Sequence, residues 1–267
     1  MMPDTSLDNA YANAAYIPGG MDYPAKWQAK AAAYREGMLE QGLADLNITY
    51  GPSARQQFDL FLPNHSPKGL VVIVHGGYWL RFNRSDFSHL ASGATARSWA
   101  VAMPSYDLCP TVRIADITQQ VASAITTASQ MVSGPIALAG HSAGGHLVAR
   151  MLEPALLASS VAARLTHVLP ISPVTDLRPL LRTSMNEDFK LDDTSAAAES
   201  PVLMQTRLPV PVTLWVGAEE RPAFLDQSRW LAEAWGVPEV IAPGRHHFDV
   251  IEPLEDPESA MLSRLLG

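Results

Sequence analysis

The chain has 267 residues, 47% of them hydrophobic, and a formal net charge of −8 at pH 7, which suits a single domain with one substantial core. Its acidic balance and lack of a basic run exclude nucleic acid and an anionic membrane surface as partners, because phosphate binding needs clustered Lys and Arg. Its one cysteine, Cys109, excludes an internal disulfide and a cysteine-based metal cluster.

The start of the chain gives no sign of export. Its first residues lack a basic segment followed by an apolar stretch, and no apolar run in the sequence approaches membrane-spanning length. The sequence therefore predicts a cytoplasmic protein without a membrane partner.

Residues 1–45 are rich in Ala, Tyr and polar residues and carry a helical pattern from about Pro24 to Leu39. We expect an N-terminal helical segment that lies across the domain. The next two strand-like stretches, residues 47–50 and 58–62, flank the turn-forming tripeptide G-P-S at residues 51–53. This arrangement predicts an antiparallel β-hairpin.

From residue 70 onward, strand-like and helix-like stretches alternate. Apolar runs typical of buried parallel strands occupy residues 70–74, 99–103, 135–139, 166–171, 212–216 and 239–241. Amphipathic stretches fall in the gaps, at residues 114–132, 223–235 and 258–266. This order predicts one α/β domain over residues 1–267, with a mostly parallel central sheet, an N-terminal antiparallel hairpin and helices on both faces. Residues 176–201 lack a strong strand and are expected to form a small helical cap.

The pentapeptide G-H-S-A-G at residues 140–144 lies between a predicted strand and a helix-like stretch. A serine at a sharp strand-to-helix turn needs small neighbours, because the strand and the helix approach each other closely there. Gly140, Gly144 and Gly145 meet this demand. Ser142 is therefore a candidate catalytic nucleophile.

A serine hydroxyl is a weak nucleophile at neutral pH and needs a histidine base and an acid that orients the base. The acid is expected just beyond a strand: Glu220 is preferred, the adjacent Glu219 is the alternative and Asp176 is a third candidate. The base is expected in the loop after the last strand, where either His246 or His247 could face the serine. No H-E-x-x-H pattern accompanies this histidine pair, so neither a metal nor another cofactor is predicted.

The chemistry also needs hydrogen-bond donors for the oxyanion that forms during acyl transfer. The motif H-G-G-Y-W at residues 75–79 directly follows a predicted strand. Glycines there let backbone N–H groups approach the reacting carbonyl without a Cβ in the way. We expect the donors to be the amides of Gly76, Gly77 and Ala143, the residue after the nucleophile.

Together these motifs resemble the kynurenine formamidase (arylformamidase) branch of the α/β-hydrolase superfamily, close to carboxylesterases of the hormone-sensitive-lipase type. The resemblance covers nearly all of the chain from about Leu46 onward. Its marks are H-G-G-Y-W at residues 75–79, G-H-S-A-G-G-H at 140–146, D-L-R-P-L at 176–180 and H-F at 247–248. It implies an α/β-hydrolase fold and places the catalytic triad on Ser142, Glu220 and His247.

The chain departs from this family pattern at one place. Many relatives carry Ser-x-Glu-Phe after the acid, whereas residues 221–224 here read R-P-A-F. A carboxylate is lost and a cation, Arg221, is gained near the acid. We expect this exchange to affect substrate preference.

The sequence thus predicts a serine hydrolase that cleaves a small acyl amide or ester through an acyl-enzyme, and the resemblance implies an arylformamidase acting on N-formylkynurenine-type substrates. Tyr78, Trp79 and Phe248 are expected to stack against an aromatic substrate ring. A carboxylesterase for short-chain esters uses the same machinery and is the alternative. A non-catalytic ligand-binding protein on a hydrolase scaffold is a more distant one. The expected partner is a small-molecule substrate, and the sequence leaves a homodimer open.

Overall fold

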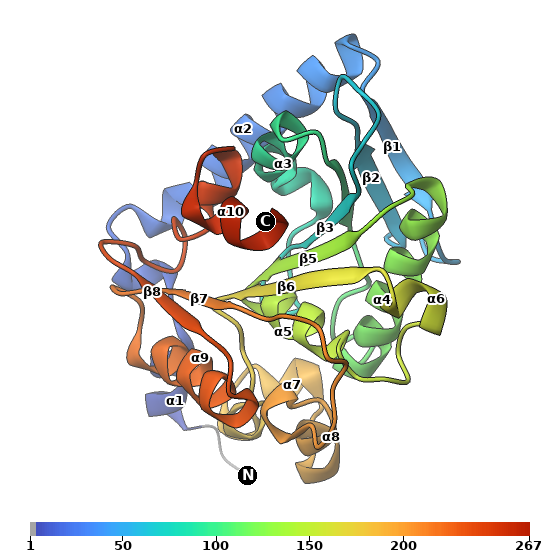
Figure 1. The fold of residues 1–267 in the computed structure, drawn as a ribbon. Coiled ribbons are helices and arrows are strands. Elements are labelled where there is room, and N and C mark those ends of the chain that lie inside the picture. The colour runs from blue at the N-terminus through green and yellow to red at the C-terminus, as the bar shows by residue number, and fades with distance from the viewer. Residues whose placement is uncertain (1–3) are drawn as a thin grey trace.

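The computed structural model describes residues 4–267, which form one eight-stranded sheet with helices on both faces (Figure 1). Residues 1–3 of the predicted N-terminal segment lie outside the described residues. The strands are β1 (Ala44–Thr49), β2 (Gln57–Phe61), β3 (Leu70–Val74), β4 (Ala100–Pro104), β5 (Ile136–His141), β6 (Leu165–Ile171), β7 (Leu214–Gly217) and β8 (Glu239–Ala242). Their order across the sheet is β1-β2-β4-β3-β5-β6-β7-β8.

β2 runs antiparallel to both of its neighbours, β1 and β4. All pairs from β4 to β8 are parallel. The predicted fold class, a mostly parallel sheet with an N-terminal antiparallel hairpin, is confirmed.

Helices precede the first strand, fill most of the later connections and follow the last strand. They are α1 (Thr5–Tyr11), α2 (Tyr23–Glu40), α3 (Ser92–Ala96), α4 (Ile114–Met131), α5 (Ala143–Arg150), α6 (Ser159–Ala162), α7 (Asn186–Phe189), α8 (Asp193–Ala198), α9 (Pro222–Trp235) and α10 (Ala260–Leu266). Across residues 4–267, no helix combines the length and the apolar character needed to cross a membrane.

The sheet is buried on both faces because its central strands carry apolar residues at successive positions, and successive side chains point to opposite sides. In β3, Val72 and Val74 pack in the cluster that includes residues of α4 and α5. Val71 and Ile73 pack in the second cluster, with residues of α2, α3 and α10. The two layers of helices thus hold the strands from both sides (Figure 1).

The parallel strands all end at the same edge of the sheet, which is where open α/β sheets bind ligands. The segments that follow β3, β5, β7 and β8 at this edge carry the residues predicted to be functional. Residues far apart in the sequence therefore meet at this edge: Glu220 and His141 contact His247 from 27 and 106 residues away.

The N-terminal segment joins the cap region. The Asp4 amide donates to the Arg182 carbonyl oxygen at 2.7 Å, and the Asp8 carboxylate accepts from the Ser184 amide at 2.7 Å. Residues 178–182, α7 and α8 form the helical stretch expected over residues 176–201. Two regions far apart in the sequence thus lie side by side.

The close approach of α5 to the sheet predicts a strict size limit at Gly144. A Cβ there would lie 2.0 Å from the Val74 carbonyl oxygen. We expect Gly144→Ala to lower the free energy of unfolding by roughly 1–3 kcal/mol or more, because backbone has to move to admit the methyl group. Urea unfolding measures this change.

Gly37→Ala is the matched control. Gly37 lies inside α2, where an added Cβ would meet no atom within 4 Å. The same substitution there should raise stability by up to about 1 kcal/mol, since alanine favours the helix. Equal effects of the two substitutions would contradict the packing argument.

Candidate active site

Ser142 occupies the turn between β5 and α5 with φ 56° and ψ −116°. Positive φ is uncommon for a residue with a Cβ. The turn is fixed on both sides: the Ser142 amide donates to the Ile171 carbonyl oxygen at 2.8 Å, and its own carbonyl oxygen accepts from the His146 amide at 3.1 Å. Ser142 is 3% exposed and lines a cavity. The predicted strand-turn-helix geometry is thus present.

Glu220 follows β7, and His247 lies in the loop after β8. The His247 Nδ1–H donates to Glu220 Oε2 at 2.6 Å. The other carboxylate oxygen of Glu220 accepts from the Gly217 amide at 2.9 Å and from the Ser172 hydroxyl. Both side chains are buried. Both carboxylate oxygens are therefore hydrogen-bonded. The bond to Nδ1 fixes the orientation of the imidazole and leaves Nε2 unprotonated, as a possible proton acceptor.

The other candidate residues lie elsewhere. Glu219 is exposed, and Asp176 pairs with the Arg178 guanidinium at 2.7 Å. His246 Nε2 is hydrogen-bonded to the Tyr23 hydroxyl at 3.1 Å. Among the described residues, no group of three or more His, Cys, Asp or Glu is arranged to hold a metal ion.

His141 supports His247 from behind. Its Nε2–H donates to the His247 carbonyl oxygen at 2.9 Å, and the two rings lie 4.6 Å apart. Burial, with His247 next to it, holds the pKa of His141 well below 6.5. His141 thus braces the backbone of His247 as a neutral group. Sequence reasoning missed this role, because nothing local in residues 140–144 reveals a partner 106 positions away.

The predicted oxyanion donors lie at or beside the Ser142 turn. A Cβ on Gly76 would lie 3.0 Å from the Ser142 Cβ, so the two residues are in contact. Gly77 has φ 112°, a conformation that favours glycine. Between residues 4 and 267, the amides of Gly76, Gly77 and Ala143 donate to no protein acceptor. For Ala143 the reason is that it begins α5, where amides have no intrahelical acceptor.

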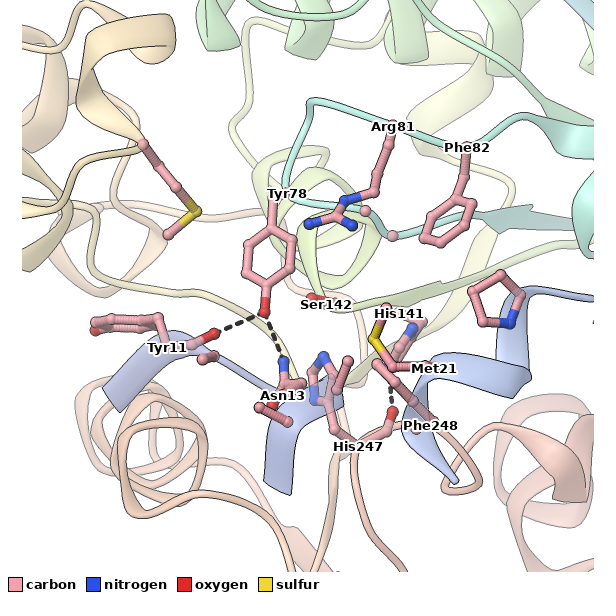
Figure 2. Close-up of a pocket in the computed structure, with 18 of the residues that line it drawn as sticks. Tyr11, Asn13, Met21, Tyr78, Arg81, Phe82, His141, Ser142, His247 and Phe248 are labelled. Atoms are coloured by element: carbon pink, nitrogen blue, oxygen red, sulfur yellow. Dashed lines mark hydrogen bonds between the residues drawn. The ribbon is translucent and has the colours of Figure 1, made fainter. Parts of the chain in front are cut away.

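Ser142 and His247 face one cavity of about 460 Å³ (Figure 2). Much of its wall is aromatic: Trp27, Phe82, Phe87 and Phe248 line it. The N-terminal segment supplies another large part of the wall, from Asp8 to Trp27, and the cap region adds Ser184 and Met185. The sequence pattern gave no signal that the N-terminal segment encloses the site, because it depends on long-range contacts alone.

Tyr78 lies on the cavity wall, but its hydroxyl is already used. It donates to the Tyr11 carbonyl oxygen at 2.6 Å and accepts from Asn13 Nδ2 at 2.8 Å (Figure 2). A hydroxyl has one proton to donate, so Tyr78 offers a ligand its ring rather than its O–H. Tyr78 and Phe248 thus both line the cavity, and their contact with a substrate stays a prediction.

Trp79 lies outside the cavity wall, which corrects its expected place against a substrate. Its side chain is fully buried in the core and makes edge contacts with the rings of His146 and Phe189. The turn at residues 78–79 has positive φ at both positions. Tyr78 points along the cavity, and Trp79 anchors the same loop to the core beneath.

Arg221, the cation that departs from the family pattern, holds the N-terminal segment. Its guanidinium carbon lies 3.7 Å from the centre of the Tyr16 ring, and Nη2 donates to the Asn9 carbonyl oxygen at 3.2 Å. It does not line the cavity. Any influence on substrate preference would therefore act through the position of the N-terminal wall.

Comparison with known proteins decides the family. A model described as the alpha/beta hydrolase fold matches residues 71–221, more than half of the chain. The chain belongs to the α/β hydrolase family. This hydrolase is 27% identical to a kynurenine formamidase of Salmo salar, over 90% of this chain and 87% of the relative. It is 30% identical to one of Drosophila melanogaster, over 82% and 79% of the two chains.

A solved structure is more similar still. A crystal structure from Silicibacter sp. TM1040, provisionally named a thioesterase, has 59% sequence identity and a TM-score of 0.96. The match covers 98% of this chain and 99% of that one. The relatives by sequence support a hydrolase of the formamidase and esterase kind.

The buried histidines predict that the hydrolase loses stability in mild acid. Burial lowers the pKa of His75 from 6.5 to about 4 and that of His146 from 6.5 to about 3, and it lowers that of His141 as well. Below pH 6.5 these histidines bind protons in the unfolded chain but stay unprotonated in the folded chain. The free energy of unfolding should therefore fall between pH 6.5 and pH 4, by about 1.4 kcal/mol per pH unit for each such histidine.

Urea unfolding at a series of pH values from 7.5 to 4.5 measures this slope. We expect His146→Gln to reduce the slope, because glutamine binds no proton in either state and one histidine no longer contributes. His65→Gln is the control, since His65 is exposed, and it should leave the slope as in the parent. Stability that rises as the pH falls from 7.5 to 5 would contradict the prediction.

Proposed function

We propose that this protein is a serine hydrolase that cleaves aryl formamides. The observation that carries the proposal is the cavity that both Ser142 and His247 face, whose walls are largely aromatic. Glu220 is hydrogen-bonded to Nδ1 of the His247 imidazole. The similarity to kynurenine formamidases over most of the chain supports the choice of substrate class.

The reaction would begin with proton transfer from the Ser142 hydroxyl to His247 Nε2. The serine oxygen attacks the formyl carbon, and the carbonyl oxygen becomes an oxyanion that accepts hydrogen bonds from the amides of Gly76, Gly77 and Ala143. Glu220 stabilises the imidazolium that forms.

The imidazolium next gives its proton to the nitrogen of the aryl amine, the C–N bond breaks and a formyl ester remains on Ser142. Water, deprotonated by His247, attacks this ester, and formate leaves as the serine recovers its proton. An aryl amine leaves more readily than an alkyl amine, and a formyl group needs little room beside the turn. The aromatic walls of the cavity suit the aryl part of the substrate.

A carboxylesterase for short-chain esters remains the second candidate. It needs the same groups at the same places, and the esterase fold neighbours and the thioesterase name of the Silicibacter protein belong to this wider class. What separates the two functions is the relative rate on each substrate, which only measurement provides.

The first test compares kcat/KM for N-formylkynurenine, p-nitrophenyl acetate and phenyl thioacetate. We expect formamide hydrolysis at least as fast as that of the activated ester. Ser142→Ala should lower kcat on every substrate by about 10⁶-fold, because the nucleophile is lost. Activity that survives the substitution would contradict the mechanism, and ester or thioester turnover without formamide turnover would contradict the substrate class.

The second test separates the two neighbouring carboxylates. Glu220→Gln keeps the shape of the side chain but removes the charge that faces His247 Nδ1, and we expect kcat to fall by roughly 10⁴-fold. Glu219→Gln is the matched control and should change kcat less than threefold, since this side chain is exposed. The Glu219 backbone amide, which donates to the Arg245 carbonyl oxygen, is unaffected by the substitution. Similar losses in both variants would contradict the assignment of the acid.

A further inference from the structure

Arg81 lies at the rim of the cavity with an exposed side chain. It is the one Lys or Arg among the described residues that line the cavity. Arg84 and Arg178, by comparison, each bind a carboxylate within 3.0 Å. The Arg81 side chain makes neither an ion pair nor a hydrogen bond with any residue from 4 to 267. Its five N–H donors are therefore free for a ligand.

The backbone of Arg81 is fixed to the oxyanion loop. Its amide donates to the Gly77 carbonyl oxygen at 3.1 Å. The next residue is held as well, because Arg55 Nη2 donates to the Phe82 carbonyl oxygen at 2.6 Å. The guanidinium thus extends from a rigid loop that also carries two of the proposed oxyanion donors.

A tyrosine ring supports the guanidinium. The Arg81 Cζ lies 5.7 Å from the centre of the Tyr78 ring, a cation–π arrangement. That ring is itself held by the hydrogen bonds of its hydroxyl to Tyr11 and Asn13. Figure 2 shows Arg81 and Tyr78 on one side of the pocket, across from His247 and Phe248. A substrate bound between these sides would meet the planar face or edge of the guanidinium.

Asp8, the acidic residue of the cavity wall, binds Ser184 and forms no hydrogen bond with Arg81 in the described part of the chain. The Asp8 carboxylate accepts from the amide and the hydroxyl of Ser184, at 2.7 and 3.0 Å. The cavity thus offers one exposed positive charge at its rim, beside aromatic walls.

From this arrangement we infer that Arg81 binds a carboxylate on the leaving-group part of the substrate, so that aromatic carboxylates are preferred over neutral aryl substrates. The inference rests on the proposed hydrolytic function and narrows its substrate class to aryl substrates that carry a carboxylate. A guanidinium fork matches the two oxygens of a carboxylate, which an ammonium group does not. Arg81 would act as a specificity-determining residue, without a part in bond breaking.

The test compares kcat/KM for two esters that differ by one group, 3-acetoxybenzoate and phenyl acetate. A charge-assisted hydrogen bond of ordinary strength corresponds to a loss of roughly 10- to 100-fold when its donor is removed. We expect Arg81→Gln to lower kcat/KM for 3-acetoxybenzoate by that factor and to lower it at least tenfold less for phenyl acetate. Arg81→Lys should recover part of the preference, because it keeps the charge without the fork.

Arg229→Gln is the control, since Arg229 lies exposed on α9 and pairs with Asp226; it should leave the ratio of the two esters unchanged. An equal loss on both esters would overturn the inference and show a structural role for Arg81. No loss on either ester in Arg81→Gln would overturn it as well.

A binding measurement keeps this test independent of turnover. In the Ser142→Ala background, calorimetry gives Kd for 3-formamidobenzoate and for the neutral formanilide. We expect Arg81→Gln to weaken only the first, by roughly 10- to 100-fold. Equal affinities for the two ligands in the parent would overturn the inference. Failure of the proposed function shows differently, as absent formamide turnover in a protein that still prefers the carboxylate.

Discussion

The backbone at Ser142 has φ 56° and ψ −116°, a conformation that costs a residue with a Cβ of the order of 1–3 kcal/mol, and the surrounding fold is built to hold it there. α5 approaches the sheet so closely that Gly144 touches the Val74 backbone, and the Ser142 amide is tied to β6. Because these contacts involve backbone atoms, they leave little freedom for adjustment. Gly76 lies against the serine on the sheet side, and α5 begins directly after the serine, so that the Ala143 amide has no intrahelical acceptor.

Charge in the candidate active site is organised around one buried carboxylate. Glu220 is buried, and its two oxygens are satisfied by an amide, a hydroxyl and the imidazole of His247. Burial lowers the pKa of His141, which lies against His247, and that of His75, so both are neutral. The negative charge of Glu220 is thus met by the imidazole on one oxygen and by neutral donors on the other. The neutral histidines instead act as hydrogen-bond donors that brace loops.

The parts of the fold that follow from local pattern were predictable from the sequence. The apolar runs that became β3 to β8 and the small residues around Ser142 are local signals, and they placed the candidate residues in the right order at one edge of the sheet. Three features were not predictable, since each depends on contacts across the chain. These are the bond from His141 to His247, the burial of Trp79 and the stacking of Arg221 on Tyr16. The function of the N-terminal segment as a wall belongs to the same class.

The cavity combines two kinds of structure that are held in different ways. The floor of the cavity, with Ser142, Glu220 and His247, is fixed by strand ends and by buried hydrogen bonds. The N-terminal wall is held by exposed ion pairs, such as that of Asp4 with Arg182, whose guanidinium side chain is 55% exposed. It is also held by buried contacts, in which the Tyr78 hydroxyl binds Tyr11 and Asn13. Exposed ion pairs contribute about 1 kcal/mol or less, and weakly held segments open first. Within the wall, the end at Asp4 is therefore held less strongly than the stretch around Tyr11, whose carbonyl oxygen is bound by Tyr78 from the loop of the proposed oxyanion donors.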